Sequence, residues 1–241
     1  MCMHKVVCVS FLLACATTCR AGMTFSDGTF EDANWTATTI ASTGGTSFNV
    51  GQTASGGNPG TFRQIQNTYG GTQPTGSIFT GHLRSAAIYD PSTQGEIQSL
   101  DFAFDLIGFD FGASNAVAYT ALLFQDGFYY SSNSYPLIQA PANQWNSFTL
   151  PNLVASGFSR IGGAGETPDF SATGTTIQFG YGVSNGTGSP LQTMTDSGID
   201  NWQVTVNANS VVPEPSSFAL FIIGCLPLLR APRNRKTPKN R

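Results

Sequence analysis

The stretch Leu100-Asp101-Phe102-Ala103-Phe104-Asp105-Leu106 decides the fold of this chain, because its apolar and polar residues alternate. Side chains of a β-strand point to opposite faces in turn, so the leucines and phenylalanines share one face and the aspartates share the other. A strand with one apolar and one polar face borders a core. The sequence therefore predicts a half-buried strand over 96–109, with its aspartates on the polar outer face.

Similar short runs recur between 23 and 206, each bounded by glycine, proline, asparagine or serine. Residues 55–60 are a strong turn signal, and Asp126-Gly127 predicts a hairpin that joins 117–124 to 128–131. Long helical periodicity is not found. A pattern of about eleven strands predicts an all-β fold, built as an antiparallel sandwich of two sheets.

The charge is distributed unevenly along the chain. Residues 22–210 contain three arginines, no lysine and thirteen acidic residues, a formal charge of −10, although the whole chain carries −3. Such a surface repels nucleic acid and attracts cations. This segment also has no cysteine, which excludes disulfides, cysteine-ligated metals and a cysteine nucleophile within it.

The first 21 residues have the pattern of a secretory signal peptide. Lys5 precedes an apolar run over 6–16, and Cys19-Arg20-Ala21 offers a cleavage site with small residues on either side. Residues 12–15 also resemble a bacterial lipobox, although Leu13 fits its position poorly, so lipidation is kept as an alternative. The pattern predicts export through the Sec translocon and removal by signal peptidase.

Residues 211–241 contain three successive segments. Pro213, Glu214 and Pro215 form an extended motif, because proline blocks both helix and ladder pairing. The apolar run over 218–229 would make a helix of about 18 Å, shorter than the roughly 30 Å core of a bilayer. The basic tail over 230–241 carries the charge expected on the cytoplasmic side of a membrane.

This order of motif, short transmembrane helix and basic tail resembles the PEP-CTERM sorting signal of Gram-negative bacteria. The resemblance implies recognition by an exosortase, a membrane-embedded cysteine protease-transpeptidase that removes the tail near the motif. It also implies a cell that makes exopolysaccharide, and a mature protein at the cell surface, the outer membrane or the extracellular matrix after passage through the inner membrane. An ordinary single-pass tail anchor is the alternative.

The segment between the two signals, 22–210, resembles jelly-roll sandwiches of the carbohydrate-binding-module and concanavalin-like type. The resemblance implies a two-sheet antiparallel jelly roll. The residues that carry it are short pieces spread along the segment: Phe30-Glu31, Trp35, Asn58-Pro59-Gly60, Tyr89-Asp90-Pro91, Phe179-Gly180-Tyr181 and 198–204.

The same resemblance implies a structural Ca²⁺ between the first and last strands, where Glu31 and Asp200 occupy matching positions. Calcium takes about six to eight oxygen ligands, which carboxylates, carbonyls and waters can supply. The alternative is that both carboxylates cap turns at the ends of sheets. Zinc is not expected, because His82 is the only histidine beyond the signal peptide.

Aromatic side chains that gather in one polar region suggest a glycan-binding site. Tyr129, Tyr130 and Tyr135 lie among serines and an asparagine, and Trp145 follows soon after. Aromatic rings can stack on sugars while the polar neighbours bond hydroxyls. Tyr129 and Tyr130 point to opposite faces if extended, so one of them is expected in the core. The core is also the favoured alternative for Trp145 and Trp202.

A catalytic constellation is not expected. A glycosidase needs two carboxylates about 5 to 10 Å apart, whereas Asp101 and Asp105 on one strand face are separated by about 13 Å. His82 has no nucleophile elbow of the Gly-x-Ser-x-Gly type to act with.

The sequence therefore predicts an exported, non-catalytic surface or matrix protein, sorted by an exosortase and associated with exopolysaccharide. A self-associating structural or adhesive protein and a polysaccharide-active enzyme are the two alternatives.

Overall fold

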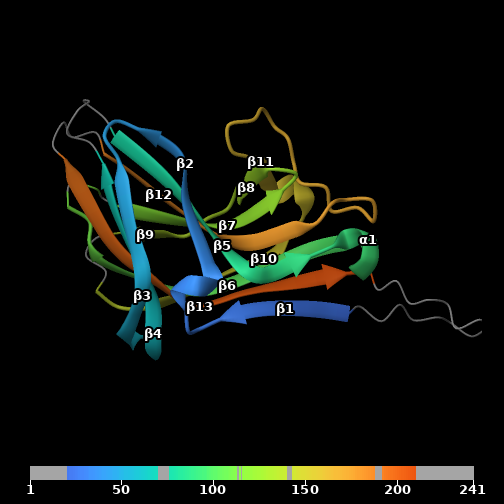
Figure 1. Ribbon diagram of the computed structural model, residues 1–241, viewed down its shortest axis with the longest axis horizontal. Coiled ribbons are helices and arrows are strands. Elements are labelled where there is room, and N and C mark those ends of the chain that lie inside the picture. The colour runs from blue at the N-terminus through green and yellow to red at the C-terminus, as the bar shows by residue number, and fades with distance from the viewer. Residues whose placement is uncertain are drawn as a thin grey trace, which may run out of the picture. The chain divides into compact units, whose positions relative to one another are not determined.

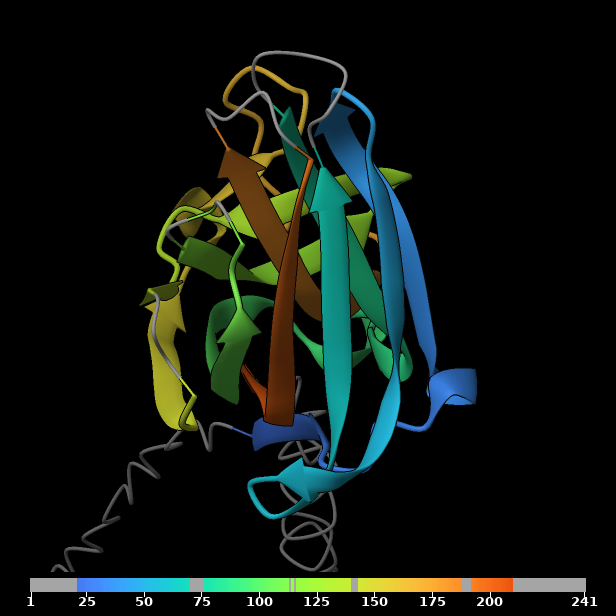
Figure 2. The same ribbon diagram turned by 90° about the vertical axis from the view of Figure 1, so that its left-hand side faces the viewer.

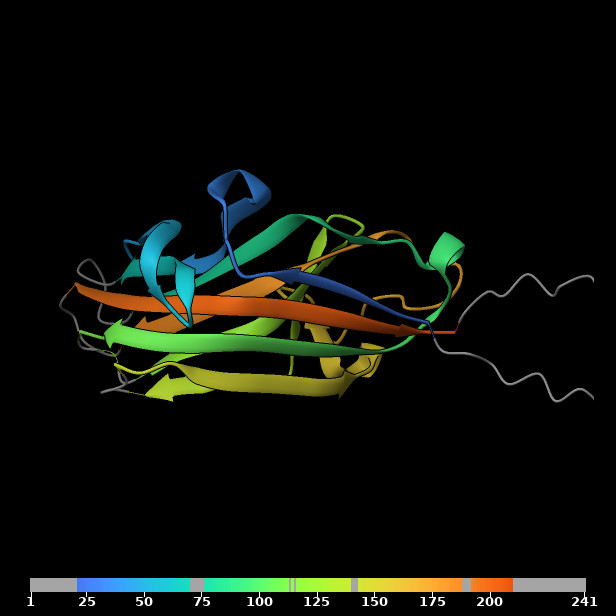
Figure 3. The same ribbon diagram turned by 90° about the horizontal axis from the view of Figure 1, so that it is seen from below.

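The computed structural model describes residues 21–69, 76–112, 114, 116–139, 143–187 and 192–209. These residues form thirteen β-strands in two antiparallel sheets that pack face to face as a jelly-roll sandwich (Figures 1 and 3). The predicted all-β, two-sheet fold is confirmed. The predicted signal peptide and the sorting segment lie outside the described residues, apart from Ala21.

Sheet A has six strands. In spatial order they are β10 (Asn146–Leu153), β6 (Ile97–Asp110), β13 (Thr193–Ala208), β4 (Gly60–Tyr69) and β3 (Ser47–Gly57), and β1 (Ala21–Asp27) pairs with β13 as well. Figure 2 shows β3 and β4 as one long hairpin, with its turn at the lower end of the view.

Sheet B has seven strands. In spatial order they are β11 (Phe158–Arg160), β8 (Phe128–Ser132), β7 (Ala116–Gln125), β12 (Ile177–Thr187), β5 (Gly76–Tyr89) and β2 (Trp35–Thr43), and β9 (Leu137–Gln139) pairs with β7. The helical turns in the described residues are short: η1 (Asp32–Asn34), α1 (Pro91–Gln94) and η2 (Ala155–Gly157). In this part of the chain no helix has the length and apolar character needed to cross a bilayer.

Strand β13 is the central strand of sheet A. One edge pairs with β6 along most of its length, which Figure 3 shows as two ribbons running side by side. The other edge pairs first with β4 and then with β1. A register shift between Asp200 and Gln203 lets both Ile199 and Trp202 face the core, although three positions separate them. The bulge therefore joins two strand halves whose apolar alternation is out of phase.

The alternating strand predicted over 96–109 is β6, and its leucines and phenylalanines lie in the core as expected. The hairpin at Asp126-Gly127 is also confirmed, with positive φ angles of 53° and 82° at its two turn residues. Other boundaries were predicted wrongly: the run over 47–50 is part of a strand, β3, that continues to Gly57, the run over 201–206 is part of β13, which begins at Thr193, and β9 was not predicted at all. These segments are rich in glycine, serine or threonine, or are very short, so their periodicity is weak.

The aspartates of β6 depart from the prediction of a polar, solvated outer face. Asp101 remains half-buried on that face, but Asp105 is only 9% exposed. The tip of the β3–β4 hairpin covers Asp105, because the side-chain amide of Asn58 donates to its carboxylate at 3.1 Å. A hairpin folded over its own sheet cannot be read from the alternation of a single strand.

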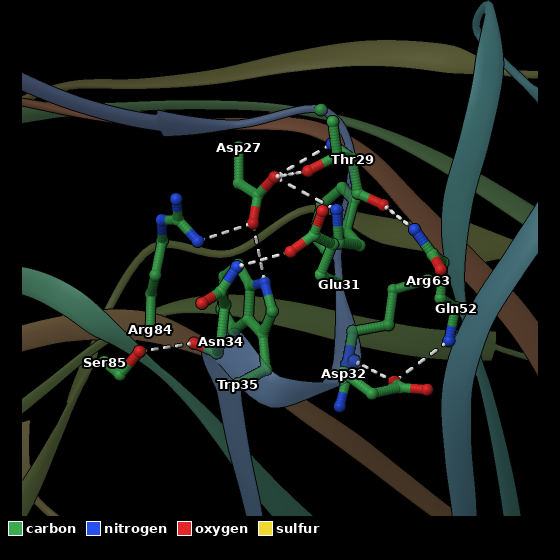
Figure 4. A network of polar contacts seen from close by, with 12 residues as sticks. Asp27, Thr29, Glu31, Asp32, Asn34, Trp35, Gln52, Arg63, Arg84 and Ser85 are labelled. Carbon is green, nitrogen blue, oxygen red and sulfur yellow. Dashed lines mark hydrogen bonds and ion pairs between the residues drawn. The ribbon is translucent and has the colours of Figure 1, made fainter.

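Asp27, at the end of β1, ties the two sheets together (Figure 4). Its carboxylate accepts hydrogen bonds from the Thr29 amide at 2.8 Å, the Thr29 hydroxyl at 2.9 Å and the Phe30 amide at 3.0 Å. From sheet B, the indole of Trp35 donates at 2.9 Å and Arg84 donates at 2.6 Å. Burial alone would raise the pKa of Asp27, but its hydrogen bonds, above all those from Phe30 and Thr29, hold the pKa below the usual value.

Trp35 is the aromatic centre of the same region. Its ring centroid lies 5.3 Å from those of Phe30, Tyr181 and Trp202. Trp202 belongs to sheet A and Tyr181 to sheet B, so Trp35 packs against both layers. Because Asp27 fixes the orientation of this indole, one carboxylate controls both the β1–β2 turn and the aromatic packing between the sheets.

Replacing Asp27 by asparagine should lower the free energy of unfolding by about 3 kcal/mol, because Arg84 loses a largely buried partner and an amide cannot accept all five hydrogen bonds. Urea unfolding of the purified protein at pH 7 would measure the change. Glu31→Gln is the matched control, since exposed Glu31 bonds only to Asn34 in the same turn. Equal losses in the two variants would contradict the assignment.

Candidate functional site

The structure separates the four aromatic residues predicted to bind glycan. Tyr130 is 7% exposed and faces the core, whereas Tyr129, the next residue on β8, lies on the outer face of sheet B. One of the two tyrosines was expected in the core, and it is Tyr130. Tyr135 is 51% exposed beside the same outer face. Trp145 lies elsewhere, on the outer face of sheet A.

A hollow on the outer face of sheet B, which we call the Tyr135 hollow, opens where β5, β7, β9 and β12 lie close together. Its apolar wall is made by Phe79, Tyr135 and Leu137. Hydroxyl-bearing residues complete the lining: Thr120, Ser131, Ser132 and Ser184. Among the described residues, no charged side chain lines it.

Thr120 is the most unusual member of this lining. It is 5% exposed, and its hydroxyl oxygen is buried without a hydrogen-bond partner among the described residues. Gly182 lies beside it, where an added Cβ would come within 2.6 Å of Phe79 and 2.8 Å of the Thr120 hydroxyl. Glycine therefore lets the Phe79 ring approach β12 closely, and the hollow keeps one unsatisfied hydroxyl in its wall.

A second hollow, which we call the Phe124 hollow, lies further along β7 and is lined by Phe124, Asp126, Ile88 and Gln178. Tyr129 packs beside it on Phe124, with ring centroids 4.8 Å apart and ring planes tilted by 49°. Ala118 lines the first hollow and Phe124 the second, so about 20 Å of strand separates them. The outer face of sheet B thus offers two aromatic-edged depressions along one line.

For Trp145 the core was the favoured alternative to a glycan site, but the structure places it half-buried on the outer face of sheet A. Its ring packs on Phe62 with centroids 5.4 Å apart, and Phe62 in turn contacts Phe109 at 5.7 Å. The indole donates to the carbonyl of Gly56 in the β3–β4 hairpin at 2.9 Å. Trp202, for which the core was also favoured, is fully buried there.

Asp105 and Asp200 form one of two carboxylate pairs that sit directly opposite each other on β6 and β13, and Asp110 and Asp196 form the other. Asp200 accepts from the backbone amides of Asn58 at 2.5 Å and Asn201 at 2.7 Å. The side-chain amide of Asn201 donates to Asp105 at 2.7 Å. Burial raises the pKa of Asp200 despite these bonds. Both carboxylates therefore hold the hairpin tip and are covered by it.

The residues predicted to bind Ca²⁺ make separate contacts. Glu31 is exposed and accepts from the Asn34 side chain, whereas Asp200 is fully buried and accepts from two backbone amides. In the described part of the chain, no group of three or more histidine, cysteine, aspartate or glutamate residues is arranged to hold a metal. Calcium at Glu31 and Asp200 stays a prediction.

His82 is a core residue on β5. It is fully buried, stacks on Tyr181 with ring centroids 4.6 Å apart, and its Nε2 lies 3.1 Å from the Thr80 hydroxyl. Burial, with a smaller contribution from nearby Arg63, lowers its pKa to about 3. A neutral, enclosed imidazole of this kind supports packing and does not contact an open surface.

The arginines of the described residues are all paired with carboxylates. Arg63 contacts Asp32 at 2.8 Å, Arg84 contacts Asp27 at 2.6 Å, and Arg160 pairs with Glu166. The domain therefore has thirteen acidic residues and three arginines, and each arginine is already paired with one of these carboxylates. That this surface repels nucleic acid stays a prediction.

Sequence reasoning did not place Phe79, Leu137, Phe62 and Phe109 on the outer faces of the sheets, where Phe62 is itself buried at 4% exposure. Alternation along 77–89 would have placed Phe79 on the other face of the strand from Thr80 and His82. The same alternation also fits a phenylalanine whose face is turned to the core. Leu137 lies on a strand of three residues, which is too short to show a period. Only the pairing of the strands shows which face of each sheet is turned outward.

No protein-family model matches this chain, and no curated protein matches its sequence.

Several solved structures similar to this chain are carbohydrate-binding modules, and another is an arabinose-bound α-L-arabinofuranosidase. The family 11 module of the cellulosomal cellulase Lic26A-Cel5E of Clostridium thermocellum is 14% identical, with a TM-score of 0.38 over 76% of this chain and 95% of that one. The C-terminal family 22 module of Clostridium thermocellum Xyn10B is 14% identical, with a TM-score of 0.42 over 78% and 96%. The CBM22-1 xylan-binding domain of Paenibacillus barcinonensis Xyn10C is 12% identical, with a TM-score of 0.40 over 80% and 99%. Likeness at this level does not identify a ligand, which has to be argued from the residues of this chain.

Replacing His82 by phenylalanine should flatten the pH dependence of stability. The folded protein keeps His82 neutral down to a pKa of about 3, while the unfolded chain takes up the proton near its usual pKa of 6.5. Proton uptake by the unfolded chain therefore lowers the free energy of unfolding as the pH falls below 6.5. The loss amounts to about 2 kcal/mol between pH 7 and pH 5. Urea unfolding at both pH values should show this loss in the wild type and a smaller one in His82→Phe. Equal losses would contradict a buried neutral imidazole.

Proposed function

We propose that this protein is an exported, non-catalytic binder of neutral polysaccharide, and that the outer face of sheet B is its ligand surface. The observation that carries the proposal is the half-exposed ring of Tyr135 beside a hollow whose lining has hydroxyls and apolar surface but no charge. An exposed aromatic ring at the rim can stack on a sugar, and neighbouring hydroxyls can both donate and accept. A ligand rich in hydroxyl groups fits that lining better than an ionic or purely apolar one.

The length of the surface supports a chain rather than a single sugar. The Tyr135 hollow and the Phe124 hollow lie about 20 Å apart along β7, which is several sugar units. Aromatic rings stand at both ends, with Tyr135 at one and Tyr129 packed on Phe124 at the other. An extended polysaccharide lying along β7 would contact both.

The absence of catalysis is part of this proposal. The two opposed carboxylate pairs, Asp105 with Asp200 and Asp110 with Asp196, both lie on the opposite sheet, and the first pair is engaged with the hairpin tip. The neutral His82 is enclosed between the sheets. Neither arrangement offers an acid and a base beside the Tyr135 hollow, which leaves binding as the activity that its lining supports.

Tyr135→Ala should weaken retardation of the protein in native gels that contain galactomannan, hydroxyethylcellulose or arabinoxylan. Loss of one stacking ring is expected to cost about 1 to 3 kcal/mol, or roughly 5-fold to 150-fold in affinity. Phe128→Ala is the matched control, because Phe128 is also an exposed aromatic residue but alternates to the other side of β8 from Tyr129. If the wild type is retarded by none of the three neutral polysaccharides, the proposal is wrong.

We also propose that the chain reaches the cell surface through its two end segments. Residues 1–21 would direct export, and an exosortase would act at Pro213, Glu214 and Pro215. Support comes from the order of motif, apolar run and basic tail, and from the lysine-free acidic domain between the signals. Association with exopolysaccharide would then follow from the glycan-binding face.

Mass spectrometry of the mature protein recovered from the native cell surface would test the sorting proposal. We expect the residues before 22 and those beyond the 213–215 motif to be missing, with any attached group seen as added mass. Recovery of a chain that continues to Arg241 would instead identify an ordinary membrane anchor. That result would leave the glycan proposal intact, since the two proposals rest on different segments.

A further inference from the structure

We propose that the outer face of sheet A is a second binding surface for neutral polysaccharide, so that one molecule can join two glycan chains. This inference rests on residues that take no part in the Tyr135 hollow. It goes beyond glycan binding as such, because a protein with ligand surfaces on both sheets would act as a cross-link in a polysaccharide matrix.

The first element of this surface is a polar strip that crosses β3, β4 and β13. Asn49 is paired with Gln66, and Gln66 with Asp196, so the three side chains follow one another across the sheet. Gln64 lies beside them on the same face of β4. Two carboxamides and a carboxylate in a row supply donors and acceptors in the mixture that sugar hydroxyls require.

The strip is held in place by its own hydrogen bonds. Gln64 donates to the two carboxylate oxygens of Asp196 at 2.8 and 2.9 Å, and Gln66 donates to one of them at 3.0 Å. The Asn49 amide lies 3.5 Å from the Gln66 oxygen. These contacts fix the side chains before a ligand arrives, which reduces the entropy lost on binding. A shallow hollow opens over Asn49, Gly51, Thr53, Gln64 and Gln66.

The second element is an aromatic ridge next to the strip. Phe62 is its base, because Gly198 beneath it has no side chain, and an added Cβ would come within 2.8 Å of the Phe62 ring. Phe109 is 37% exposed, and Trp145 is half-buried against Phe62. Phe62, Gln64 and Gln66 occupy alternate positions along β4, so their side chains point to the same side of sheet A. The ridge and the strip therefore share one face.

The third element is the β3–β4 hairpin, which positions Trp145. The carbonyl of Gly56 accepts the indole N–H at 2.9 Å. Two residues later, Asn58 is held by the carboxylates of Asp105 and Asp200. This gives the buried acid pair a role in binding, because it fixes the hairpin turn against which the tryptophan lies.

The charge of this surface selects the class of glycan. Asp196 lies in the strip, and Asp110 is its direct neighbour on β6. The arginines of the described domain are all engaged with other carboxylates. An anionic chain such as a uronate polymer would be repelled, so the ligand is an uncharged polysaccharide.

Trp145 provides a direct test, because the other two tryptophans, Trp35 and Trp202, are buried at 6% and 0% exposure. Acrylamide quenching of fluorescence therefore reports mainly on Trp145. We expect saturating galactomannan, hydroxyethylcellulose or arabinoxylan to protect the protein from quenching, and anionic alginate to give no protection. The protection should persist in Tyr135→Ala and be lost in Gln66→Ala. Thr68→Ala, two residues further along the same face of β4, is the matched control.

Cross-linking is measured with beads coated with the polysaccharide that binds. The wild type should aggregate them, while Tyr135→Ala and Gln66→Ala should each bind beads without aggregating them. The contrary result would be a polysaccharide that retards the wild type in native gels more than Tyr135→Ala and yet leaves acrylamide quenching unchanged. That result would overturn the second surface and leave the first intact. Protection that disappears in Tyr135→Ala would also overturn it, because the two faces would then act as one site.

Discussion

The carboxylate of Asp27 is the contact on which this sandwich depends. It closes the turn after β1, orients the indole of Trp35 and pairs with Arg84, and these groups belong to both sheets. The turn it closes includes Phe30, which is fully buried at a φ of 52°. A non-glycine residue is rarely found there unless neighbouring contacts compensate the strain. One buried charge therefore sets where the first strand ends and how the layers meet.

Two further contacts fix the register of one sheet over the other. Asn67 on β4 donates to Asn185 on β12 at 2.7 Å, and Tyr119 on β7 donates to Ser197 on β13 at 2.8 Å. Both bonds cross the interior, where they are stronger than in water and costly to leave unmade. Together with the Trp35 packing they hold the sheets at fixed positions. The outer faces of the sheets can then carry ordered surfaces.

The two outer faces differ in chemistry, and this difference gives the protein its proposed role. Sheet B presents an uncharged hollow rimmed by Tyr135, whereas sheet A presents amides and a carboxylate beside an aromatic ridge. Both suit hydroxyl-rich ligands, and they face opposite sides of the sandwich. A protein of this design would organise polysaccharide rather than cleave it. The predicted surface destination, which rests on the end segments alone, agrees with that role.

The sequence by itself determined the class of fold, because the strict alternation of 100–106 and the turn at Asp126-Gly127 encode strand faces and a hairpin locally. It also determined that the exported domain is acidic and without cysteine, since those are properties of composition. Tertiary structure alone decided which aromatic residues reach the surface. Tyr130 lies in the core while Tyr129 and Trp145 lie on outer faces, because strand pairing, and a hairpin fastened to Asp105 and Asp200 from distant strands, set those faces. Such long-range contacts leave no periodic signal in the chain.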